Sequence, residues 1–123
     1  MGQDSFQRVA EFFGEVAGAA DSQRELSRYD QIIQFHILNE QPFFIRVSGG
    51  KVSSQSGETG DRDFQKVLKI ETDAATITAL LERRRTLGEA LFEGKVNIYG
   101  NAAKEHVIAW LSKLFRTGGI NDF

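Results

Sequence analysis

The spacing of apolar residues changes along the chain from three or four residues to two, and this change constrains the fold more than any other feature. Within residues 4–20 the apolar side chains recur at intervals of three and four, which places them on one face of a helix. Asp4 or Ser5 offers a side-chain oxygen that can cap the first turn, and Phe12 falls off the stripe. The predicted stripe consists of Phe6, Val9, Ala10, Phe13, Val16, Ala17 and Ala20.

After Tyr29 apolar residues alternate with polar ones, which is the period of a strand with one buried face. A turn at residues 39–42 joins the first two strands into a hairpin. Gly49-Gly50 tolerates the positive φ angles of a tight two-residue turn and leads into a more polar third strand. The predicted strands of this half of the chain cover residues 33–37, 43–47, 51–55 and 64–70.

The second half of the chain returns to helical spacing with one further strand. A helix is predicted to begin at Thr72 or Asp73 and to run into the three arginines of residues 83–85. A short helix over 87–92 ends at Gly94, and a strand follows over 95–99. The final helix is predicted to be capped by Asn101. Its inward-facing residues are Ala103, Val107, Trp110, Leu111, Leu114 and Phe115. Helices beside a hairpin-built sheet predict an α+β domain.

The chain of 123 residues has the length of one compact domain and contains no linker-like stretch, so residues 1–123 are expected to form a single domain. Its 41% hydrophobic and 26% charged residues are typical of a globular protein in water. The chain has no apolar run of about 18 residues. Its first residues also lack the basic segment followed by an apolar segment that is typical of a secretory signal. We therefore expect a cytoplasmic protein without stable membrane insertion.

Composition and motifs exclude several function classes. The absence of cysteine removes disulfides, thiolate metal sites and cysteine nucleophiles. A formal net charge of −2 gives no basic field for nucleic acid. His36 and His106 have no neighbours at metal-ligand spacing, and no Gly-x-Ser-x-Gly elbow or phosphate-binding glycine loop occurs. We expect no catalytic residues, no metal, no cofactor and no enzyme activity.

Three segments carry a resemblance to a known family. Residues 44–52 read Phe-Ile-Arg-Val-Ser-Gly-Gly-Lys-Val, and residues 89–101 read Glu-Ala-Leu-Phe-Glu-Gly-Lys-Val-Asn-Ile-Tyr-Gly-Asn. The third is the amphipathic terminal helix ending in Leu114-Phe115. In this order they resemble the sterol carrier protein 2 family over residues 29–116. Leu91 stands where that family often has phenylalanine, and Asn101 where it often has aspartate.

The resemblance divides the domain into an N-terminal helix and connection (1–28), the best-matching region (29–116) and a tail (117–123). It implies a five-stranded, mostly antiparallel sheet covered on one face by helices, which enclose an apolar tunnel for a fatty acid, fatty acyl group, sterol or isoprenoid-like lipid. The residues expected to line this tunnel are Phe13, Phe35, Ile37, Phe43, Ile45, Leu81, Leu91, Phe92, Leu111 and Phe115. The same side chains could instead fill a close-packed core, because alternation does not distinguish a filled interior from a tunnel.

Arg84 falls on the helical face defined by Ile77 and Leu81, where its guanidinium could meet a lipid head group. The alternative is a solvated last turn that favours cations through the helix dipole.

Two functional hypotheses follow. The first is non-catalytic binding, and transfer, of a lipid; the second is a solidly packed interaction or accessory module in lipid or quinone metabolism. The first helix is expected to pack over the sheet with Phe6, Val9 and Phe13 and to close one side of the cavity, with a homodimer contact as the alternative.

Overall fold

The structure is a computed structural model that describes residues 4–18, 30–60, 66–100 and 104–117. The helices of this part of the chain are α1 (Asp4–Gly18), α3 (Ala74–Leu81), α4 (Leu87–Phe92) and α5 (Lys104–Thr117). The strands are β1 (Gln31–Ile37), β2 (Phe43–Ser48), β3 (Lys51–Ser56), β4 (Val67–Thr72) and β5 (Asn97–Gly100).

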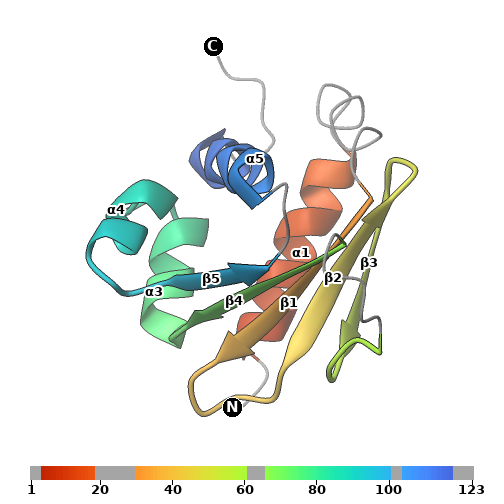
Figure 1. The fold of residues 1–123 in the computed structure, drawn as a ribbon, viewed down its shortest axis with the longest axis horizontal. Helices are drawn as coiled ribbons and strands as arrows, with labels where there is room; N and C mark the ends of the chain where they lie inside the picture. The colour runs from red at the N-terminus through yellow and green to blue at the C-terminus, as the bar shows by residue number, and fades with distance from the viewer. Residues whose placement is uncertain (1–3, 19–29, 61–65, 101–103, 118–123) are drawn as a thin grey trace.

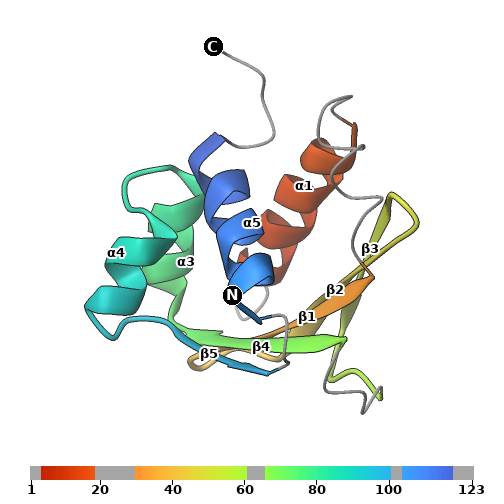
Figure 2. The same cartoon turned by 45° about the horizontal axis from the view of Figure 1, so that its top comes forward.

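These strands form one five-stranded sheet within the described ranges, in the order β3-β2-β1-β4-β5. The pairs β1–β2, β2–β3 and β4–β5 are antiparallel, and β1–β4 is parallel. All four helices lie on one face of this sheet (Figures 1 and 2). The predicted α+β class, with a mostly antiparallel sheet covered on one face, is therefore confirmed.

The β2–β3 hairpin has the tight turn that its two glycines predict. Ser48 pairs with Lys51, which leaves Gly49 and Gly50 as the two turn residues, with φ angles of 60° and 80°. Such angles are costly for residues with a Cβ, which explains why glycine stands at both positions. The register that follows places Val47 opposite Val52.

Helix α3 ends earlier than predicted. Asp73 caps the start of this helix, since the Thr76 N–H donates a hydrogen bond to the Asp73 Oδ1 at 2.7 Å. Asp73 is one of the two residues that the sequence offered as caps. The last helical residue is Leu81, and Arg83 has a φ of 62°, so the arginines form a turn instead of a final helical turn. A new helix begins directly afterwards, because Thr86 and Glu89 form a capping box at the start of α4.

Helix α1 packs across β3 and β2 and against α3, which confirms the expectation that it covers the sheet. Val9, Phe13 and Val16 are fully buried. Phe12, predicted to lie off the stripe, is also buried, which corrects that prediction. The reason is geometric: Phe12 and Val16 are four residues apart and so share a face, and α1 buries a wider face than the stripe because it also meets α5.

Some predicted features fall outside the described residues: Phe64 in the fourth strand, the Asn101 cap, Ala103, and the side chains of Val107 and His106. The fourth strand is described from Val67, with Leu68 and Ile70 facing the helices as expected. No helix in the described ranges reaches the length and apolarity of a membrane-spanning segment.

Candidate functional site

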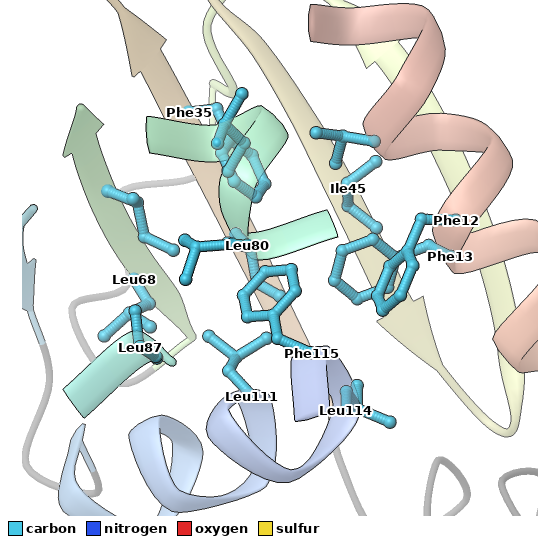
Figure 3. Packing of buried hydrophobic residues seen from close by; sticks show 14 of the residues in the cluster. Phe12, Phe13, Phe35, Ile45, Leu68, Leu80, Leu87, Leu111, Leu114 and Phe115 are labelled. Carbon is cyan, nitrogen blue, oxygen red and sulfur yellow. The ribbon is translucent and has the colours of Figure 1, made fainter. Parts of the chain in front are cut away.

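A continuous apolar interior lies between the helices and the sheet, and it is the candidate site (Figure 3). The strands contribute alternate side chains to it, since Ile33, Phe35 and Ile37 of β1 face the helices together with their β2 neighbours. Each of the four helices in the described ranges contributes as well. The buried cluster consists of Val9, Phe12, Phe13, Val16, Ile33, Phe35, Ile37, Phe43, Ile45, Val47, Leu68, Ile70, Ile77, Leu80, Leu87, Ala90, Val96, Trp110, Leu111, Leu114 and Phe115.

Nine of the ten residues predicted to line a lipid site belong to this interior or pack against it. Leu81 and Leu91 are partly buried at its edge. The fully or almost fully buried members of the predicted set are Phe13, Phe35, Ile37, Phe43, Ile45, Leu111 and Phe115.

Phe92 is a correction, because this residue is 93% exposed. Helix α4 has six residues, and it turns Leu87 and Ala90 into the interior. Positions two apart on a helix do not share a face, so Phe92 points away when Ala90 points inward. The predicted place of Phe92 on the wall of the interior is therefore wrong.

Aromatic rings connect the layers of this interior at two places. Beside the β1–β2 hairpin, Phe35 stacks on Phe43 with centroids 4.9 Å apart, and Phe6 of α1 lies 5.1 Å from Phe43. Further along α1, Phe12 stacks on Phe115 of α5 at 5.4 Å. These contacts join the first part of α1 to the sheet and a later part of it to α5.

A polar contact at the start of α1 was not anticipated from the sequence. The carboxylate of Glu40, on the β1–β2 turn, accepts hydrogen bonds from the Ser5 N–H at 3.3 Å and the Ser5 hydroxyl at 3.0 Å. Ser5 is 2% exposed. A carboxylate from a distant turn thus satisfies an early N–H group of the helix, a role that the sequence assigned to Asp4 or Ser5. No local spacing could have revealed a contact between residues 35 positions apart.

The opposite face of the sheet carries buried Ile32 and Phe44 beside polar side chains, and it is held to the loop after β3. Gln34 is buried, and its side-chain amide donates to the carbonyls of Phe43 and Gly57 and accepts from the Thr59 N–H. Nearby, the His36 Nε2 lies 4.0 Å from a Glu58 carboxylate oxygen. The described residues contain no group of three histidine, aspartate or glutamate side chains that could hold a metal ion.

Arg84 lies outside the apolar interior. Its guanidinium Nε donates to Glu82 at 2.9 Å, and its side chain is 61% exposed. This hydrogen bond is the main reason why the pKa of Glu82 is lowered from its ordinary value. The predicted position of Arg84 on the inner helical face is therefore wrong, because α3 ends at Leu81 before reaching it.

On the outer sheet face, the Tyr99 hydroxyl donates to Glu71 at 3.2 Å, which raises the pKa of Tyr99. The ammonium of Lys69 lies 3.4 Å from the same carboxylate. These side chains are in contact with water and are separated from the apolar interior by the sheet.

Comparisons with known proteins agree with this architecture. The SCP-2 sterol transfer family matches residues 13–109. No curated protein sequence gives a significant match. Among solved structures, palmitated SCP2L2 from Aedes aegypti has a TM-score of 0.65 and 18% identity, over 94% of this chain and 95% of that chain. The UbiJ-SCP2 ubiquinone synthesis protein has a TM-score of 0.64 and 14% identity, over 85% and 90%.

A larger protein contains the same fold as one part. The sec-alkylsulfatase Pisa1 from Pseudomonas sp. has a TM-score of 0.65 and 17% identity over 93% of this chain, but the match spans 16% of the alkylsulfatase. At these identities the likeness concerns the fold.

Proposed function

We propose that this chain, which belongs to the SCP-2 sterol transfer family, binds the apolar chain of a fatty acid, fatty acyl group or isoprenoid-like lipid between its helices and its sheet. The proposed role is binding, and transfer, without chemistry on the ligand. The observation that carries it is the coincidence of the family match with an apolar interior to which every described helix contributes.

The chemistry of this interior suits a hydrocarbon chain. Its members are aliphatic and aromatic side chains, with phenylalanine from α1, β1, β2 and α5. Phenylalanine rings carry no hydroxyl that needs a hydrogen-bond partner, so a methylene chain can lie against them without leaving a polar group unsatisfied. The structural neighbour from Aedes aegypti is described in a palmitated form, which makes palmitate a suitable first ligand to test.

The energetics favour moderate affinity. Burying the roughly fourteen methylene groups of palmitate gains about 11 kcal/mol, at roughly 0.8 kcal/mol each. Association and ordering oppose this gain by about 4 kcal/mol or more, and side chains that now touch each other must move to admit the ligand. Longer chains gain proportionally more, so we expect dissociation constants in the micromolar range for long chains and weaker binding for short ones.

The direct test is fluorescence titration of the purified protein with cis-parinaric acid, followed by displacement with palmitate. We expect saturable binding at one molecule per chain and competition by palmitate. Native mass spectrometry of the same preparation should detect the palmitate complex. A folded protein that shows no saturable binding to either ligand would rule out the proposal.

A second candidate is an accessory interaction module, and the exposure of Phe92 favours it. A phenylalanine that is 93% exposed contributes no packing inside the domain and is of a type enriched at protein interfaces. In this case the interior is a filled core, and neither cis-parinaric acid nor palmitate binds.

A further inference from the structure

We infer that a lipid enters and leaves the interior between the C-terminal half of α1 and helix α5, by separation of the Phe12 and Phe115 rings. This inference rests on the proposed function, since it concerns the route to the same apolar interior. Three independent features of α1 support it: where its polar contacts lie, how it meets α5, and where its glycine is placed.

Among the described side chains of α1, those with polar contacts lie in its first half. Ser5 donates two hydrogen bonds to Glu40, and the Arg8 guanidinium lies 3.4 Å from the Glu82 carboxylate at the end of α3. These contacts attach the start of the helix to the β1–β2 turn and to α3. After Arg8 the helix is held through the apolar side chains of Val9, Phe12, Phe13 and Val16. The second half can therefore move away from the sheet without breaking the polar contacts of the first half.

Helices α1 and α5 lie side by side above the sheet (Figure 2). They are in contact through the rings of Phe12 and Phe115. The planes of Phe12 and Phe115 are inclined by 25°, with centroids 5.4 Å apart. Phe12 retains 9% exposure, whereas the adjacent Phe13 retains none, so the Phe12 ring stands at the boundary between water and the interior. Stacked rings can separate without leaving a hydrogen-bonding group unsatisfied, and a hydrocarbon chain can replace each ring's partner.

Gly14 lies in the middle of α1, directly after the two phenylalanines, and on the exposed side of the helix. A Cβ added at Gly14 would meet no atom within 4 Å, so packing does not explain the glycine. Glycine weakens a helix interior relative to alanine because it has more conformational freedom to lose. Gly14 lies two residues after Phe12, beyond the polar contacts of Ser5 and Arg8, so it weakens the helical turn that follows the Phe12 ring.

The experiment measures cis-parinaric acid binding by stopped-flow fluorescence in the full-length wild type and three variants. Phe12→Leu removes the ring that meets α5. Phe92→Leu is the matched control, because it makes the same substitution at a ring that is 93% exposed and lies outside the interior. Gly14→Ala stiffens the helix without creating a steric clash.

We expect Phe12→Leu to raise the association and dissociation rates together by about threefold or more, with the dissociation constant changed less than twofold. Phe92→Leu should leave both rates within twofold of wild type. Gly14→Ala should lower both rates and raise the melting temperature, and it tests the inference even if Phe12→Leu does not fold. If wild type binds but Phe12→Leu matches Phe92→Leu, or Gly14→Ala leaves the rates unchanged, the entrance lies elsewhere and the proposed function stands. If wild type does not bind, both proposals fail.

Discussion

Asp73 determines where α3 begins, because its carboxylate accepts the Thr76 N–H at 2.7 Å in the first turn of the helix. The hydrogen bond with the Thr76 side chain, followed by this backbone hydrogen bond, lowers the pKa of Asp73 from its ordinary value of 3.8. We expect Asp73→Ala to reduce the free energy of unfolding at pH 7 by about 1 kcal/mol, the usual value of a cap.

The same residue predicts a pH dependence. Since the pKa in the folded state is lowered, the stabilisation is complete above the unfolded value and is lost as the pH falls through the folded value. The stability difference between wild type and Asp73→Ala, measured by urea unfolding, should therefore be constant near neutral pH and shrink below pH ~4. A difference that persists unchanged in acid would show that the charged carboxylate is not responsible.

Phe92 and Phe13 test the boundary of the interior with the same substitution. Phe13 is fully buried, so Phe13→Ala should lower the free energy of unfolding by about 3–5 kcal/mol. Phe92 is 93% exposed, so Phe92→Ala should change it by no more than about 0.5 kcal/mol. Thermal or urea unfolding of the two variants measures the contrast. A large loss of stability in Phe92→Ala would mean that α4 turns this ring inward in solution.

At the scale of elements, α1 depends on Glu40, a residue of the turn between two strands. Glu40→Ala leaves the buried Ser5 without its acceptor, and we expect a loss of about 1–3 kcal/mol of stability in urea unfolding. Glu15→Ala is the control, since Glu15 is exposed on the same helix and should change stability by less than about 0.5 kcal/mol. Equal stability of the two variants would show that the hydrogen bonds between Ser5 and Glu40 contribute nothing to the free energy of unfolding.

Most elements could be predicted from the sequence because each has a local signal. Alternation identified the strands, Gly49-Gly50 identified the hairpin turn, and the apolar stripe identified α1. The end of α3 was predicted too late in the chain. The capping box of Thr86 and Glu89 starts a new helix there, and apolar periodicity does not reveal such a box. Phe92 was misplaced for a related reason: in a six-residue helix, a one-residue uncertainty in phase decides which side chain faces inward.

At the scale of the whole molecule, the arrangement of layers follows from the wide buried face of the helices and the alternation of the strands. Nearly all residues predicted for the site lie in or beside the interior, because core-facing positions are what periodicity detects. Contacts between distant segments were not predictable in this way. The Ser5–Glu40 pair, the buried Gln34 amide and the Phe12–Phe115 stack each depend on the packing of elements that are far apart in the chain.

The interior also predicts how ligand binding changes the stability of the whole domain. A ligand that binds only the folded state stabilises it by about 2.7 kcal/mol at a concentration one hundred times the dissociation constant. For a domain of this size the melting temperature should then rise by roughly 10 °C.

Chain length separates this effect from unspecific adsorption. Each added methylene that enters the interior contributes about 0.8 kcal/mol, or roughly a fourfold gain in affinity. At one fixed concentration below micelle formation, the melting temperature measured by differential scanning calorimetry should rise progressively from octanoate to palmitate, then level off when the chain outgrows the interior. An unrelated folded protein serves as the control for detergent-like effects. A melting temperature that is the same with octanoate, palmitate and no fatty acid would mean that the apolar interior is a filled core, and would favour the interaction module with its exposed Phe92.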